Sequence, residues 1–174
     1  MEIIRNYGSG DPGYTERYRE NGSERLDHVS NFDGTDQPGF WSDYFELRLD
    51  ECIAEIQELA DFCEDNDIQL RIVTNPLYYK TYAIGVENGY LDFLEALADV
   101  TEYYNFSGYS DVTTYDGNYY ETSHFTTDVT RMMMDVVYHD WSDETLLSQG
   151  FGVKVTAENK ADVIALLREQ AAAR

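Results

Sequence analysis

The fold is decided by residues 45–76, FELRLDECIAEIQELADFCEDNDIQLRIVTNP. Apolar side chains recur every three or four residues in its first part, which predicts an amphipathic helix over residues 42–64 with Ser42 as its N-cap. The β-forming run 68–74 then predicts a strand that ends before Asn75. Because a helix, a short turn and a strand make up half of a βαβ unit, the stretch predicts an α/β fold with a parallel sheet.

The chain that follows continues the alternation of helix and strand. Ligands of parallel α/β folds bind where the strands end, so Thr74 and Asn75 mark the expected crevice. One face of the helix expected at 128–139 is apolar, and of its three consecutive methionines only one is expected to be partly exposed. In chain order we expect a loop with a short helical turn at 78–89, an amphipathic helix at 91–103 with Leu91, Leu94, Leu97 and Ala98 inward, a parallel strand at 104–107, the helix at 128–139 and a last helix at 157–172 capped by Thr156.

The first 40 residues differ in character from the rest. They are rich in Gly, Asp, Asn and Tyr and show no sustained period, which predicts an irregular arm. We therefore divide the chain into an arm (1–40), an α/β part (41–150) and a C-terminal segment with its helix (151–174). Only two predicted strands precede that segment, so the sheet is expected to be incomplete. Its apolar faces then need cover from the arm, from another protein chain or from a missing N-terminal half.

The charge of the chain excludes two classes of partner. There are 34 acidic residues against 12 basic ones, which gives a formal net charge of -22. Nucleic-acid phosphates and anionic lipids are bound by clustered Lys and Arg, so neither is an expected partner. Basic partners, cations and neutral ligands stay open, as does an adaptation of solubility to a salty environment. No apolar run is long enough to enter a membrane and no secretory leader is recognised, so we expect a soluble chain whose compartment the sequence leaves undetermined.

The two cysteines, Cys52 and Cys63, fall on the same predicted helix. Eleven residues return them to nearly the same helical face, but about 16 Å apart along the axis. That separation is too long for a disulfide, so both are expected to be buried free thiols.

A polar loop before the helix at 128–139 holds the candidate catalytic residues. Glu121 and His124 lie close enough for the carboxylate to orient the imidazole and to stabilise its protonated form. No nucleophile is recognised beside them, since Ser9 is better explained as part of a glycine-rich turn. The acidic stretches 33–36 and 111–116 lack the spacing of a calcium loop, so no metal and no cofactor is expected.

The order of these pieces, with Asn75-Pro76, YNFSGY at 104–109, YYETSHF at 119–125 and FGV at 151–153, resembles the C-terminal half of SGNH-type (GDSL-like) hydrolases. The resemblance covers roughly residues 45–170, and its most specific part is the block from Glu121 to His124. The nearest branch is that of bacterial cell-envelope esterases and acyltransferases, which remove or transfer acyl groups on polysaccharides.

The resemblance implies a flavodoxin-like three-layer α/β/α sandwich. It implies that His124 is the general base and Glu121 its orienting acid, where Asp is commoner. Asn75 and Ser123 would contact the substrate, an acylated carbohydrate, and the location would be the cell envelope. The family's Gly-Asp-Ser nucleophile block is not found, so the resemblance implies a domain that is inactive as this chain alone.

A second hypothesis belongs to another class of protein. The chain would be a non-catalytic acidic structural or binding module of a larger assembly, with the arm wrapped around a neighbour. The fifteen tyrosines fit a packed core or an interface better than a carbohydrate-stacking surface.

Overall fold

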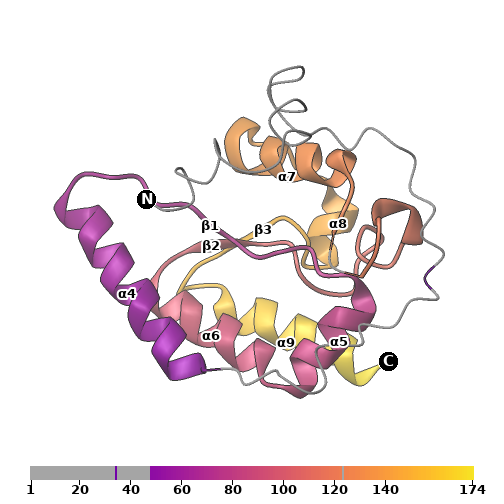
Figure 1. Ribbon diagram of the computed structural model, residues 1–174, viewed down its shortest axis with the longest axis horizontal. Coiled ribbons are helices and arrows are strands. Elements are labelled where there is room, and N and C mark those ends of the chain that lie inside the picture. The colour runs from indigo at the N-terminus through magenta and orange to yellow at the C-terminus, as the bar shows by residue number, and fades with distance from the viewer. Residues whose placement is uncertain (1–33, 35–47, 123) are drawn as a thin grey trace, which may run out of the picture.

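The structure is a computed structural model that describes residue 34 and residues 48–122 and 124–174. Ser42, the predicted N-cap, and most of the predicted arm lie outside the described residues. A small sheet runs through the middle of the molecule with helices on both of its faces (Figure 1), which confirms an α/β fold. The elements are α4 (Leu49–Asp65), β1 (Ile72–Val73), α5 (Tyr79–Glu87), α6 (Tyr90–Val100), β2 (Tyr103–Asn105), the 3-10 turn η1 (Asp116–Asn118), α7 (Thr127–His139), α8 (Glu144–Ser148), β3 (Val153–Val155) and α9 (Lys160–Ala172).

The sheet has three described strands in the order β1-β2-β3. Strands β1 and β2 are parallel, as the sequence predicts. In this pair Ile72 lies opposite Tyr103. Strand β3 is antiparallel to β2, so the expectation of a wholly parallel sheet is wrong. The cause lies at Asn105, which ends β2: its carbonyl accepts from Gly152 N at 2.6 Å and its side-chain amide donates to Gly150 O at 2.8 Å. The chain therefore enters β3 beside the carboxyl end of β2 and has to run back along it.

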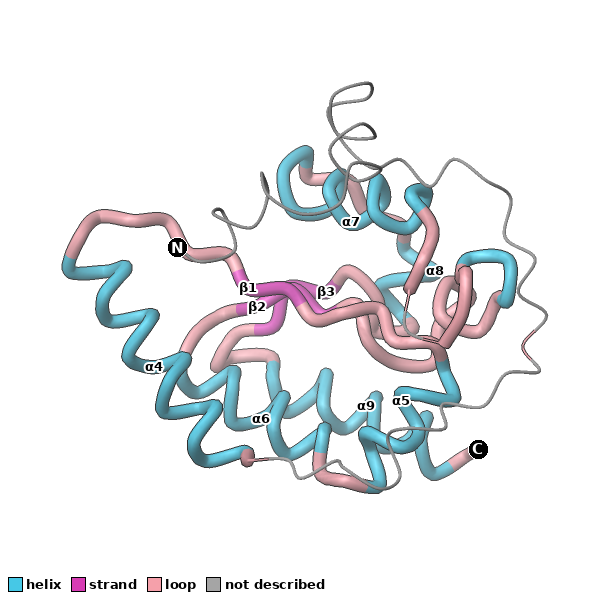
Figure 2. Tube along the Cα trace, in the orientation of Figure 1, coloured by secondary structure: helices cyan, strands magenta, loops and turns pink. Residues whose placement is uncertain are grey.

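One face of the sheet is covered by α4, α5, α6 and α9 (Figure 2). Helix α6 lies at the centre of this layer and packs against α4, α5 and α9. Its inward residues are those that the leucine spacing predicts. The buried residues of this core are Tyr82, Leu91, Leu94, Leu97, Ala98, Tyr103, Val155, Val163, Ile164 and Leu167.

The opposite face is covered by α7 and α8. Phe106 and Phe151 pack edge to face there, with ring centroids 5.1 Å apart, beneath the apolar side of α7. Met132 and Met133 are partly buried against this core, whereas Met134 is 49% exposed. The prediction of one partly exposed methionine is therefore confirmed.

Helix α4 is less covered than its apolar stripe predicts. Ile53 and Ile56 are half-buried and Cys63 is buried, but Leu59 and Phe62 are exposed. Only a narrow line of the helix faces the rest of the described core, and the stripe is wider than that line. Cys52 falls outside the line and is exposed, so the prediction that both free thiols are buried is wrong for Cys52 and confirmed for Cys63.

Two other local predictions are corrected by the structure. Residues 79–87 form a full helix, α5, where a loop with one turn is predicted, because Thr81 and Tyr82 are buried and hold the segment on the core. Helix α9 begins at Lys160 with Asn159 at its N-cap position, not at Thr156. The Asn159 side chain accepts from Thr156 N at 2.8 Å, which folds residues 156–159 into a turn ahead of the helix.

Strand β1 forms an edge of the described sheet, and apolar side chains are exposed around it. Ile68 and Val73 are 50% and 43% exposed. Immediately before β1, the Arg71 guanidinium stacks on the ring of Tyr138 at the end of α7, 4.7 Å from the ring centroid. We call this surface the open edge; it comprises the exposed side chains of Ile68 and Val73 and the Arg71–Tyr138 stack.

Candidate active site

The loop that carries the candidate catalytic residues is a tight hairpin. Tyr119 and Phe125 form an antiparallel bridge, and Tyr120 N donates to His124 O at 2.9 Å. Thr126 N donates to Asn118 O at 2.8 Å, which closes the base of the hairpin just before α7. Residues between the bridged positions are therefore presented at a turn, with Glu121 on one side of it and His124 on the other.

The structure brings Glu121 and His124 into contact. His124 Nδ1 is hydrogen-bonded to Glu121 Oε1, and the side chains are 78% (His124) and 41% (Glu121) exposed. With the proton on Nδ1 and donated to the carboxylate, Nε2 is the ring atom left to accept a proton. Within the described part of the chain the imidazole has no other hydrogen-bond partner. The pair has the form of an oriented base that faces solvent.

Two buried hydrogen bonds fix the hairpin to the segment that follows β1. Tyr119 Oη donates to Pro76 O at 2.8 Å, and Thr81 Oγ1 donates to Thr122 O at 2.8 Å. Burial raises the pKa of the Tyr119 hydroxyl, so the phenol stays protonated and remains a donor. Because one bond lies on each side of Glu121, the hairpin is held against the start of α5 at two points.

Asn75 lies immediately before the first of these anchor points. It is exposed, and its carbonyl accepts from Ser107 Oγ at 2.7 Å and from Leu77 N at 2.8 Å. The backbone is thus fixed while the residue remains open to solvent. Asn75 therefore directly precedes Pro76, the residue to which the Glu121–His124 hairpin is anchored. Ser123, the fourth predicted site residue, lies outside the described residues.

A buried polar network, not predicted from the sequence, lies where β1 and β2 end. Thr74 Oγ1 accepts from Phe106 N at 2.7 Å and from Ser107 N at 3.2 Å, and it donates to Asn105 Oδ1 at 3.2 Å. Ser107 Oγ also contacts Tyr90 Oη at 2.9 Å. The signal for this network in the sequence was the pair of polar residues on either side of Phe106, Asn105 and Ser107. Polar side chains at a buried strand end need hydrogen-bond partners within the protein.

This network corrects the expected lining of the crevice. Thr74 is 5% exposed and Ser107 is 1% exposed, and both hydroxyls are engaged within the protein. Neither can serve as the missing nucleophile without breaking these bonds. The site made by the described residues therefore contains a base and its carboxylate but no available serine hydroxyl in contact with His124 Nε2.

The described residues contain neither a metal-ligand cluster nor a membrane-spanning helix. No group of three or more His, Cys, Asp or Glu side chains within the described residues is placed to hold a metal ion. None of the described helices combines the length and the apolar character needed to cross a bilayer. The hydrogen-bonded Glu121–His124 pair offers a group for proton transfer at the imidazole.

Comparisons with protein-family models, with curated proteins and with solved structures found no significant match to this chain.

Proposed function

We propose that the chain is an SGNH-hydrolase-like domain with a flavodoxin-like architecture, related to esterases and acyltransferases that act on acylated glycans. The observation that carries the proposal is the hydrogen-bonded Glu121–His124 pair, which is tethered by Tyr119 to the carbonyl of Pro76, the residue after Asn75. Base, orienting acid and a polar residue at a strand end are three of the parts that acyl transfer needs.

In the proposed reaction, His124 Nε2 takes the proton of an attacking hydroxyl as its oxygen bonds to the acyl carbon. The Glu121 carboxylate holds the Nδ1 proton and stabilises the imidazolium that forms. The ester bond to the sugar then breaks, and the imidazolium returns the proton to the departing sugar oxygen. Asn75 offers an amide donor to the acyl oxygen, and Ser123 contacts the substrate.

The attacking hydroxyl comes, in this proposal, from outside the described residues, either from this chain or from a partner. The described part alone is therefore inactive. An added small alcohol can take the place of this hydroxyl, in the way that external reagents rescue enzymes that lack a catalytic group. The base would then accelerate transfer of an acetyl group from the glycan to that alcohol.

The test is acetyl transfer from an acetylated xylo-oligosaccharide to added methanol by the complete chain. His124→Ala and Glu121→Gln should lower the methanol-dependent rate by about 100-fold, the lower end of the range for general-base catalysis. His139→Ala is the matched control, because His139 forms a similar exposed pair with Asp135, at 2.9 Å, on α7. Equal rates for the complete chain and for both His variants would refute the proposal.

A second candidate function is favoured by the open edge. A binding module would pair β1 with another protein chain, burying Val73 and the ring of Tyr138 beside it. The Arg71–Tyr138 stack is of the kind enriched at the energetic centres of interfaces. This candidate and the catalytic one are compatible, since the open edge and the Glu121–His124 hairpin involve different residues.

A further inference from the structure

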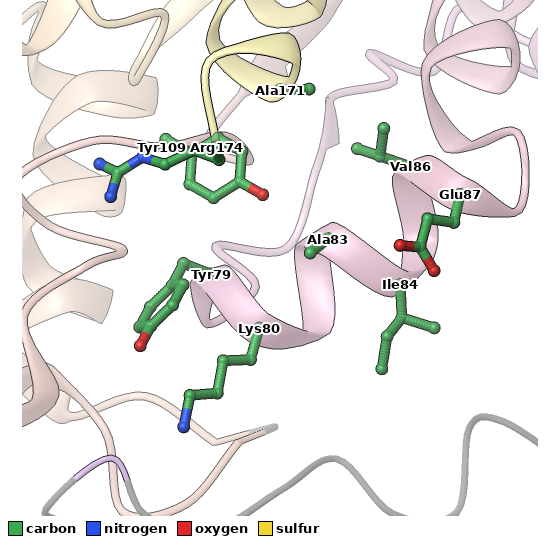
Figure 3. A pocket seen from close by; sticks show the side chains of 9 residues that line it. All are labelled: Tyr79, Lys80, Ala83, Ile84, Val86, Glu87, Tyr109, Ala171 and Arg174. Atoms are coloured by element: carbon green, nitrogen blue, oxygen red, sulfur yellow. The ribbon is translucent and has the colours of Figure 1, made fainter.

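A pocket of about 600 Å³ lies between α5, Tyr109 and the end of α9. Its size falls within the roughly 300–1,000 Å³ typical of small-molecule sites. Figure 3 shows Tyr79 and Lys80 at one end of α5, Glu87 at the other end, and Tyr109 and Arg174 across from the helix. Neither Glu121 nor His124 lines it, so this pocket is separate from the candidate active site.

The lining of this pocket contains basic side chains without an ion pair, which is unusual in so acidic a chain. Eight Lys or Arg residues are described, and most of them are neutralised by a nearby carboxylate. Among the described residues, the three without such an ion pair are Arg71, Lys80 and Arg174, and two of these line the pocket. The cations paired with carboxylates are Arg48, Arg131, Lys154, Lys160 and Arg168.

Arg174 is held in a geometry suited to a planar anion. Its guanidinium lies 5.2 Å from the centroid of the Tyr109 ring, and that ring packs edge-on against buried Tyr82, with centroids 5.1 Å apart. A guanidinium stacked on an aromatic face keeps its N–H edges directed outward in its own plane. No described residue accepts a hydrogen bond from these edges, so two parallel donors are available to a carboxylate.

Lys80 and Glu87 limit the charge of the ligand. The Lys80 ammonium donates to the carbonyl of Gly34 and lies 6.0 Å from the centroid of the Tyr79 ring, which keeps a positive charge at that end. Glu87 adds a negative charge to the lining, and the chain as a whole carries -22. The two cations Lys80 and Arg174 against the one carboxylate of Glu87 leave a net charge of +1 on the lining, which matches the single charge of a carboxylate.

The uncharged part of the lining specifies the body of the ligand. Ala83, Ile84 and Val86 give an aliphatic wall along α5, and the rings of Tyr79 and Tyr109 give aromatic faces. Such surfaces suit a ring or a short apolar group. We propose that this pocket binds a monocarboxylate carried on a ring or a short apolar body, with the carboxylate on Arg174.

Benzoate is the probe that tests this proposal, with benzyl alcohol as its neutral counterpart. Titration of the complete chain, followed by NMR of the tyrosine rings, should show saturable shifts with benzoate. The affinity for benzyl alcohol should be at least about tenfold lower, because it lacks the charge-assisted pair of hydrogen bonds. Equal affinity for the two compounds, or shifts that do not saturate, would overturn the assignment.

Three variants test which charged side chains of the pocket act on the carboxylate. Arg174→Gln should weaken benzoate binding at least about tenfold, whereas Arg168→Gln, on the same helix but already paired with Asp92 and Glu95 at 2.8 and 3.0 Å, should leave it unchanged. Glu87→Gln should tighten it about threefold by removing a like charge. An unchanged affinity in Arg174→Gln, with circular dichroism confirming the fold, would refute the site whatever the methanol-rescue assay shows.

Discussion

Tyr119 donates its phenolic proton to the carbonyl of Pro76 across 43 positions of the chain, at 2.8 Å and out of contact with water. The bond joins the start of the Glu121–His124 hairpin to the loop after β1. A local pair, Glu121 and His124, thereby acquires a fixed place relative to the sheet.

Tyr119→Phe should destabilise the fold by about 1–3 kcal/mol, because the Pro76 carbonyl would stay buried without its donor while the ring still fills its site. The measurement is the free energy of unfolding in urea. Tyr115→Phe is the control, since Tyr115 is 64% exposed and its hydroxyl should contribute little. Equal stability of the two variants would show that the bond is not formed in solution.

Thr81→Val should loosen the hairpin more than the rest of the fold. The substitution keeps the shape of the side chain but removes the donor to Thr122 O. Hydrogen exchange of the Tyr120 amide, which is bonded to His124 O within the hairpin, should become faster. Thr81→Ser keeps the hydroxyl, so its Tyr120 amide should exchange at the rate of the unaltered chain. Equal exchange rates in the Ser and Val variants would show that packing, and not the hydrogen bond, holds the hairpin.

Glu121→Gln should change the free energy of unfolding by less than about 1 kcal/mol, because exposed ion pairs contribute little. The same holds for Asp135→Asn, which breaks the comparable pair with His139. A large loss of methanol-dependent acetyl transfer in Glu121→Gln alone would then reflect chemistry and not unfolding. Urea unfolding of both variants beside the rate assay checks this, and a loss of stability above 2 kcal/mol would contradict it.

Alkaline pH should unfold the protein. Burial raises the pKa of Tyr82, of Tyr103 and of Tyr119 above the ordinary tyrosine value. Above that value, near pH 10, the unfolded chain has released these protons while the folded chain still binds them, so stability is full below about pH 10 and falls above it. Each group costs about 1.4 kcal/mol per pH unit in this range.

Urea unfolding from pH 8 to pH 11, with tyrosinate absorbance recorded in parallel, tests the sign. We expect a falling midpoint above pH 10 and a group of tyrosines that ionises only as the protein unfolds. Full ionisation of all tyrosines near pH 10 with the helical signal intact would show that these hydroxyls are accessible in the folded state.

Val73→Thr at the open edge should alter association and not folding. Val73 is 43% exposed in an edge strand, and Thr keeps its β-branched shape. The free energy of unfolding should change by no more than about 0.5 kcal/mol, as for most surface substitutions. Sedimentation should show weaker self-association or weaker binding of a partner chain. Thr130→Val, on the exposed side of α7, is the control. If Val73→Thr changes neither self-association nor partner binding, the open edge has no binding role.

The parts of the fold that the sequence predicted are those set by neighbouring residues. The spacing of Leu91, Leu94 and Leu97 identified the buried face of α6, and the contact between Glu121 and His124 followed from their separation along the chain. Helix α5 was missed because its tyrosines, its threonine and Gly85 are poor helix formers. Burial of Tyr82 and the approach of Tyr90 to Gly85 stabilise it instead.

The parts that were missed depend on contacts between distant residues. The direction of β3 is set where Asn105 binds Gly150 and Gly152, and no local pattern near residue 150 reports that pairing. The anchoring of the hairpin by Pro76 and Thr81 is equally remote in sequence. Periodicity identifies elements and near-neighbour pairs, but it does not identify which distant elements hold them.

Helix α5 carries both surfaces on which this protein is expected to act. Thr81 holds the Glu121–His124 hairpin from one side of the helix, while Lys80, Ala83 and Glu87 line the proposed carboxylate pocket on another. If α5 can occupy two placements in the fold, a ligand that binds the pocket more tightly in one of them favours that placement. The hairpin attached to Thr81 then moves with the helix. By thermodynamic reciprocity, a substrate bound at His124 would then change the affinity of the pocket by the same factor.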